Sequence, residues 1–108
     1  MSWKEISEEK DIDTIVSSSQ SKPQLIFKHS TRCSISSVVK NRLEKDLVND
    51  KIDFHYLDLI RYRNISNLVA ERFNVYHESP QVLLIKNGDC VYDESHYSIQ
   101  TDEIFENI

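Results

Sequence analysis

Apolar residues occur along the chain in two alternating patterns, short continuous runs and stripes at helical spacing. Leu25, Ile26 and Phe27 form one such run, which is typical of a buried strand. Between the runs, apolar residues recur at the spacing of one helical face. These patterns predict helices over residues 8–18, 34–49, 64–73 and 101–108, and strands over residues 24–28, 52–59, 82–85 and from 90 onward, with a short edge strand near Trp3 and Ile6.

The order of these elements predicts an α/β fold. Strands separated by helices imply parallel neighbours joined by right-handed crossovers. Asn87-Gly88 is the strongest short hairpin signal in the chain, and it adds an antiparallel pair. We therefore expect a mixed central sheet flanked by helices on both faces. We also expect Asn64 or Ser66 to cap the third helix.

A cysteine stands where a buried strand gives way to a helix. Residues 28–32 form a polar connection, and from Ile35 the apolar positions follow one helical face, so Cys33 lies at or just before the first turn. A helix start presents unpaired N–H groups and about half a unit of positive charge, which favours a thiolate. Arg32 acts in the same direction. Because the thiolate is the reactive form, Cys33 is the candidate nucleophile.

The residues after this cysteine limit what it can do. The sequence Cys33-Ser34-Ile35-Ser36 has a serine where a dithiol redox motif has its second cysteine. Such a motif can attack a disulfide but cannot resolve the product locally. The alternative is an inert cysteine that fills space at a helix start, since free cysteine is among the most buried residue types.

Length and composition narrow the function classes. A chain of 108 residues predicts one domain over residues 1–108, long enough to bury a core without disulfides or metals. The net charge of −5 argues against a nucleic-acid partner, which would need a basic face. We find neither a signal-peptide pattern nor an apolar stretch of membrane-spanning length, so we expect a cytoplasmic protein. The four histidines show no pair at ligand spacing, and we expect no metal.

Two segments of the chain resemble known redox proteins. Residues 79–88, Ser-Pro-Gln-Val-Leu-Leu-Ile-Lys-Asn-Gly, are similar to the cis-proline loop, strand and turn of thioredoxin. Residues 27–36, Phe-Lys-His-Ser-Thr-Arg-Cys-Ser-Ile-Ser, and 77–81, His-Glu-Ser-Pro-Gln, resemble the monothiol bacilliredoxins of the bacillithiol system, the YtxJ-like family. The chain departs from that family at Ser34, where we expect proline. Relative to thioredoxin, Phe27 replaces the buried aspartate and Ser36 replaces the resolving cysteine.

The resemblance implies a thioredoxin-like fold and a thiol-disulfide oxidoreductase. The implied function is to remove bacillithiol from S-bacillithiolated proteins, with Cys33 taking the thiol onto itself. A second bacillithiol molecule would then release Cys33, so bacillithiol is a co-substrate and no cofactor is expected. The resemblance also implies a cis bond between Ser79 and Pro80, beside which backbone groups would bind the substrate chain like an added strand. We expect a monomer.

Several polar residues are candidates for contacts with the thiol. Lys28, His29 and Arg32 could hold the carboxylates of bacillithiol, or they could be solvated loop charges. By a count without gaps from Pro80, His96 returns to the end of the sheet where Cys33 lies, at a place where thioredoxin has glycine. It could donate a proton to the leaving thiolate or bind a carboxylate. The candidate substrate-binding residues are Lys28, His29, Arg32, Ser34, Ser36, Ser79, Pro80 and His96.

Other readings of the same residues remain open. Cys90 could be a distal resolving thiol, but its place near the hairpin turn favours a structural cysteine. Cys33 with an external thiol could instead ligate iron, as in a monothiol glutaredoxin-like iron–sulfur carrier. A third possibility is a non-enzymatic adaptor with a thioredoxin fold, in which the cysteine is incidental.

Overall fold

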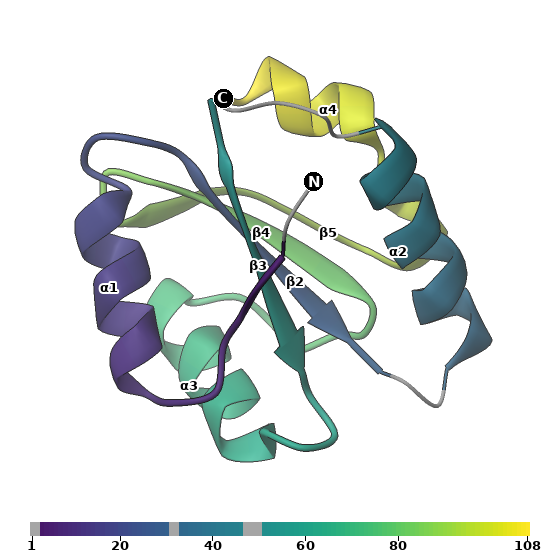
Figure 1. Ribbon diagram of the computed structural model, residues 1–108, viewed down its shortest axis with the longest axis horizontal. Coiled ribbons are helices and arrows are strands. Elements are labelled where there is room, and N and C mark those ends of the chain that lie inside the picture. The colour runs from purple at the N-terminus through teal and green to yellow at the C-terminus, as the bar shows by residue number, and fades with distance from the viewer. Residues whose placement is uncertain (1–2, 31–32, 47–50) are drawn as a thin grey trace.

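The computed structural model describes residues 3–30, 33–46 and 51–108. Its centre is a five-stranded sheet with the strand order β1-β3-β2-β4-β5 (Figure 1). The strands are β1 (Lys4–Glu5), β2 (Gln24–His29), β3 (Asp53–Asp58), β4 (Gln81–Lys86) and β5 (Asp89–Ser95). The helices are α1 (Lys10–Ser18), α2 (Ser34–Asp46), α3 (Arg63–Phe73) and α4 (Thr101–Glu106), and a 3-10 turn, η1 (His96–Ser98), follows β5. Within these ranges no helix has both the length and the apolar character needed to cross a membrane.

The strand β2 lies in the middle of the sheet and determines where the chain segments around it meet. It runs parallel to β3, with Phe27 opposite Tyr56, and antiparallel to β4, with Phe27 opposite Val82. β5 returns antiparallel to β4 through Asn87 and Gly88, whose φ angles are 52° and 81°. The end of β2, the start of β4 and the end of β5 therefore meet at one end of the sheet.

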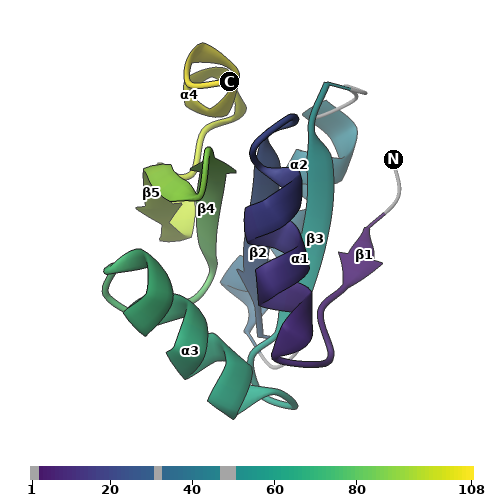
Figure 2. The same cartoon turned by 90° about the vertical axis from the view of Figure 1, so that its left-hand side faces the viewer.

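Two apolar cores lie on opposite faces of the sheet, each covered by two helices (Figure 2). Alternate residues of β2 enter them, with Phe27 on the side of α2 and α4 and Ile26 on the side of α1 and α3. The helical core residues are Val39, Leu43 and Ile104 on the first face and Ile12, Ile15, Ile65, Val69 and Phe73 on the second.

The predicted mixed sheet with helices on both faces is confirmed, and one predicted helix start is wrong. α3 begins at Arg63, so Asn64 and Ser66 lie inside the helix instead of capping it. The carboxylate of Asp58 accepts two backbone N–H groups in the turn before the helix, at 3.0 and 3.2 Å. This turn brings the chain into α3 without a side-chain cap, and the hydroxyl of Ser66 is used elsewhere.

Candidate active site

Three segments meet at the end of the sheet where β2 finishes. The chain passes from β2 through Cys33 into α2, while the loop of residues 74–79, which we name the proline loop, leads into Pro80 directly before β4. The backbone N–H of His96 donates to the carbonyl of Pro80 at 2.9 Å, and η1 contacts α2. We name the group formed by Cys33, Ser79, Pro80 and His96 the exchange site.

Cys33 lies directly before α2 and is half-buried. Its N–H donates to the carbonyl of Ser30 at 3.1 Å, and its own carbonyl accepts from the N–H of Ser37 at 3.3 Å. The thiol therefore stands at the helix start that the sequence predicted, the position at which we expected free N–H groups to favour a thiolate. Arg32, which we expected to act in the same direction, lies outside the described residues.

Ser36 occupies the place of a second thiol and is fully buried. Its hydroxyl accepts from the backbone N–H of Ser30 at 3.1 Å and lies 2.5 Å from Nδ1 of His29. The hydroxyl has one proton and two lone pairs, so it accepts from Ser30 and pairs with Nδ1 of His29 in either tautomer of the ring. Ser36 thus joins the end of β2 to α2. This corrects our expectation that Ser36 contacts substrate.

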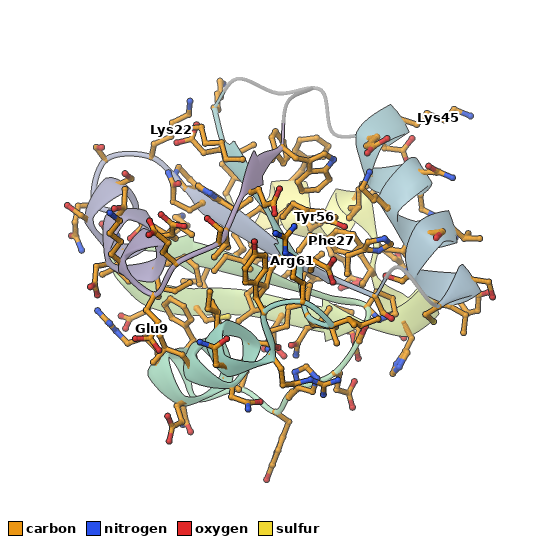
Figure 3. The ribbon with its side chains drawn as sticks, turned by 60° about the horizontal axis from the view of Figure 1, so that its bottom comes forward. Glu9, Lys22, Phe27, Lys45, Tyr56 and Arg61 are labelled. Atoms are coloured by element: carbon orange, nitrogen blue, oxygen red, sulfur yellow. The ribbon has the colours of Figure 1, made fainter. Side chains whose placement is uncertain are left out.

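His29 is buried and contacts two aromatic rings. Its ring centroid is 5.6 Å from that of Phe27 and 5.4 Å from that of Tyr56, two side chains that lie close together in Figure 3. Burial lowers the pKa of His29, and the nearby charge of Lys40 lowers it further. A neutral ring pairs with the Ser36 hydroxyl in either tautomer. His29 is therefore not a surface cation for a carboxylate, which corrects that expectation.

Lys28 has no exposed surface and points to the opposite face of the sheet, toward α3. Its Nζ donates to the carbonyl of Ser66 at 3.1 Å and to Nδ1 of His77 at 3.2 Å. Burial lowers the pKa of Lys28 to about 8. A carboxylate arriving from solvent does not reach this ammonium in the described arrangement, so Lys28 is not the substrate contact that we expected.

The Ser79–Pro80 bond is cis, as the resemblance implied. Pro80 is buried, and Ser79 is half-buried with an Oγ that has no hydrogen-bond partner in the described part of the chain. Ser34, the first residue of α2, is exposed. These positions leave Ser34 open to a ligand, while substrate binding by Ser34, Ser79 and Pro80 stays a prediction.

His96 lies against the proline loop through its backbone and its side chain. Its Nδ1 is 3.8 Å from Oε2 of Glu78, and that carboxylate also accepts a hydrogen bond from the hydroxyl of Ser95. The φ angle of His96 is 55°, a left-handed conformation that glycine adopts far more readily than a residue with a β-carbon. The left-handed conformation thus explains why thioredoxin has a glycine at the matching position. This chain has an imidazole there, although the conformation is unfavourable for a residue with a β-carbon. The expected proximity of the His96 ring to the Cys33 thiolate stays a prediction.

Cys90 stands apart from the exchange site. It pairs with Ile85 next to the hairpin turn, whereas Ser95 at the other end of β5 pairs with Gln81 beside Pro80. Burial raises the pKa of the Cys90 thiol to about 11, and both cysteines are free. This placement favours the structural reading of Cys90. Among the described residues, no three His, Cys, Asp or Glu side chains gather as metal ligands would.

Sequence reasoning missed the partners of the buried polar side chains. It assigned no contact within the site to Ser66, His77 or Glu78. One signal was present, because Lys28 continues a strand whose other side chains are buried. A lysine at such a position needs acceptors, and a neutral histidine before Pro80 is one of the few that this end of the sheet offers.

Comparison with known proteins agrees with this geometry. A solved protein described as a candidate oxidoreductase with a thioredoxin fold is 27% identical, with a TM-score of 0.85 over 95% of this chain and 90% of its own. Thioredoxins from Malassezia sympodialis and Schistosoma mansoni are 18% and 21% identical, with TM-scores of 0.75 and 0.74 over 97% and 96% of this chain and 86% and 96% of theirs. These likenesses show a thioredoxin fold.

The sequence comparison is more specific. Residues 4–104 match the family described as monothiol bacilliredoxin BrxC. The matched range includes Cys33, Pro80 and His96, and thus every segment that meets at the exchange site. The chain belongs to the monothiol bacilliredoxin family and is a thiol-disulfide oxidoreductase with a thioredoxin fold.

Proposed function

We propose that this protein removes bacillithiol from S-bacillithiolated proteins through a mixed disulfide on Cys33. The observation that carries the proposal is the pairing of a half-buried thiol at the start of α2 with Ser36, whose hydroxyl is buried where a resolving thiol would stand. A site with one nucleophile needs its second thiol from outside. A small thiol that is also the modifying group supplies it.

The proposed reaction consists of two thiol-disulfide exchanges. The thiolate of Cys33 attacks the bacillithiol sulfur of the mixed disulfide, the protein thiolate leaves and takes up a proton, and Cys33 carries bacillithiol. A second bacillithiol thiolate then attacks this adduct, which releases bacillithiol disulfide and the Cys33 thiolate. No electron leaves or enters beyond the thiols and disulfides named, so the reaction needs no metal or other cofactor. We propose a monomer that works in the cytoplasm, where thiols are kept reduced.

The proline loop and η1 supply the substrate contacts in this proposal. The backbone of Ser79 would pair with the protein substrate like an added strand. With Nδ1 of His96 turned toward the carboxylate of Glu78, Nε2 is the nitrogen left for the substrate, and in the doubly protonated ring it would donate to the leaving thiolate or to a bacillithiol carboxylate. Arg32 and Ser34 would contact the small thiol from the start of α2.

Intact-mass analysis after exposure to a bacillithiolated model protein tests the central step. The wild-type chain should gain the mass of one bacillithiol and release the model protein unmodified. Cys33→Ser should do neither, and Cys90→Ser should behave as wild type and serves as the matched control. Removal of bacillithiol by Cys33→Ser at the native rate would show that the nucleophile is misassigned.

A glycine substitution tests the role of His96 without penalising the backbone. His96→Gly removes the ring and relieves the left-handed φ, so the fold should be at least as stable as wild type. We expect release of the model protein to slow by about tenfold or more. Alkylation of Cys33 by neutral iodoacetamide should change by less than about twofold, because that reagent needs no proton donor. Equal release rates for both proteins would remove His96 from the site.

A further inference from the structure

A lysine without exposed surface lies in the central strand, and the active-site chemistry does not use it. Lys28 is opposite Leu57 on β3 and opposite Gln81 on β4, and its side chain enters the core on the α3 face. An ammonium in such surroundings is costly unless every neighbour that can accept a hydrogen bond does so. The carbonyl of Ser66 and Nδ1 of His77 are the acceptors that the fold provides.

The geometry requires His77 to be unprotonated at Nδ1. An ammonium has donors only, and Nδ1 faces both Nζ of Lys28, at 3.2 Å, and the hydroxyl of Ser66, at 3.1 Å. A protonated Nδ1 would place a donor against the ammonium and add a second positive charge beside it. With Lys28 charged, the contact between β2 and the proline loop therefore requires a neutral His77.

This contact and a neighbouring one tie residues 76 and 77 of the proline loop to the sheet, in addition to the hydrogen bond from Ser95 on β5 to the carboxylate of Glu78. Nε2 of Gln81, next to Lys28 on the neighbouring strand, donates to the carbonyl of Tyr76 at 2.8 Å. His77 follows Tyr76 directly and precedes Ser79 by two positions. One tie is neutral and the other is charged, and both act on the residues that lead into Pro80.

We propose that Lys28 is a positioning residue of the exchange site: its ammonium, through His77, fixes the proline loop so that the backbone of Ser79 faces the substrate held at Cys33. The proposal rests on the proposed exchange function and extends it to a group that touches neither substrate nor thiolate. It also explains why an ammonium occupies a position where an apolar side chain would be easier to bury.

The contact between Lys28 and His77 depends on pH, because both groups titrate and charged residues surround His77. Burial lowers the pKa of His77, and the positive charges of Lys28 on β2 and Arg63 on α3 lower it further, while Glu78 in the proline loop raises it. Near neutral pH the ring is therefore an acceptor. Below that range protonation breaks the contact, and well above pH 8 the ammonium of Lys28 loses its charge and the tie weakens.

Lys28→Met separates positioning from packing, since methionine fills the core without a charge. We expect release of a bacillithiolated model protein to fall about tenfold in kcat/KM, mostly through KM, because the misplaced loop binds substrate poorly. Stability to urea should not fall, and iodoacetamide should alkylate Cys33 within about twofold of the native rate. Lys22→Met removes a half-buried lysine that pairs with Asp53 just before β2, away from the proline loop, and is the matched control; it should leave release and alkylation unchanged and alter stability to urea only slightly.

His77→Asn tests the pH range of the same tie. The amide oxygen of asparagine can accept from Lys28 but does not titrate. At pH 7.5 this variant should retain most of the release activity. Below pH 6.5, where a histidine with a lowered pKa takes up its proton, release normalised to Cys33 alkylation should fall for wild type and stay level for His77→Asn. A parallel fall in both proteins would overturn the proposal.

The remaining outcomes also decide the question. Native release by Lys28→Met would show that the loop does not depend on the ammonium. A parallel loss of release and alkylation would mean that Lys28 acts on the thiolate through its charge, which also overturns positioning. If wild type releases no bacillithiol at all, the proposed function fails, and amide hydrogen exchange of residues 75–79 then tests the tie by itself. Faster exchange there in Lys28→Met but not in Lys22→Met supports it, and equal exchange overturns it.

Discussion

Two consecutive residues of β2 build polar networks on opposite faces of the sheet. On the α2 face, His29 pairs with the hydroxyl of Ser36 and links the strand to the helix that begins at Cys33. On the α3 face, Lys28 donates to Ser66 and His77 and links the strand to the proline loop. Each network contains a histidine, and burial lowers the pKa of both rings.

The two networks differ in the group that pairs with the histidine: an uncharged hydroxyl on the α2 face and an ammonium on the α3 face. We therefore expect the first network to be rigid and the second to respond to pH. A hydroxyl keeps its proton over the whole physiological range, whereas an ammonium with a pKa of about 8 does not. The helix that begins at Cys33 is therefore held to β2 by an uncharged hydrogen bond, between Ser36 and a histidine that packs on aromatic rings. The substrate-binding loop is held by a charged contact that titrates.

The largest expected effect is loss of the packed joint. His29→Ala removes a ring packed against Phe27 and Tyr56 and leaves the hydroxyl of Ser36 without its partner, so unfolding should become easier by about 3–5 kcal/mol. His77→Ala removes a half-buried ring and should cost clearly less. Urea unfolding of both variants at pH 7.5 measures the difference. Equal losses would contradict the contrast between the two faces.

The second effect is an increase in stability at alkaline pH. Because the folded pKa of Lys28, about 8, lies below its unfolded value of 10.5, the unfolded chain holds more protons between these limits. The free energy of unfolding should therefore rise by about 2 kcal/mol between pH 7.5 and 9.5. In Lys28→Met this rise should be absent. A rise of the same size in the variant would assign it to another group.

A smaller effect should distinguish the two serines. Ser36→Ala deprives both the N–H of Ser30 and the ring of His29 of a partner, so we expect a loss of about 1–2 kcal/mol. Ser66→Ala leaves His77 with Lys28 as its donor and should cost less than about 1 kcal/mol. Thermal unfolding of the pair checks the order. The reverse order would mean that the α3 network depends on the hydroxyl more than on the ammonium.

The smallest effect concerns a thiol outside both networks. With a pKa of about 11, Cys90 holds roughly one thousandth of its thiol as thiolate at pH 8. Iodoacetamide at that pH should label Cys33 and leave Cys90 almost untouched, and Cys90→Ser should unfold within about 0.5 kcal/mol of wild type. Peptide mapping after labelling measures both thiols in one experiment. Comparable labelling of both would contradict the burial of Cys90.

The fold was predictable because its signals are local. Apolar runs, helical stripes and Asn87-Gly88 each report on a few neighbouring residues, and together they indicated the mixed sheet. The position of Cys33 followed in the same way. The start of α3 was missed because a turn at Asp58, not a cap at Asn64 or Ser66, introduces the helix.

The roles of the polar residues were less predictable because they depend on contacts across the sheet. Lys28 and His29 are adjacent in sequence, and nothing local tells that both are buried and point to opposite faces. Their partners, Ser36 and His77, lie far enough away that only the folded chain brings them together. The pairing of Glu78 with His96 is hidden for the same reason, since it depends on the register of β4 and β5.

The buried hydroxyl of Ser36 also bears on how one-thiol and two-thiol enzymes of this fold could interconvert during evolution. A thiol at this position would be a weak donor and acceptor, so Ser36→Cys would exchange a structural joint for a second redox group. A single nucleotide change could introduce the cysteine, but it would not replace the hydrogen bonds that Ser30 and His29 lose. A route to the two-thiol state would therefore require earlier changes at the end of β2. The residues at the end of that strand should then differ between one-thiol and two-thiol enzymes of this fold.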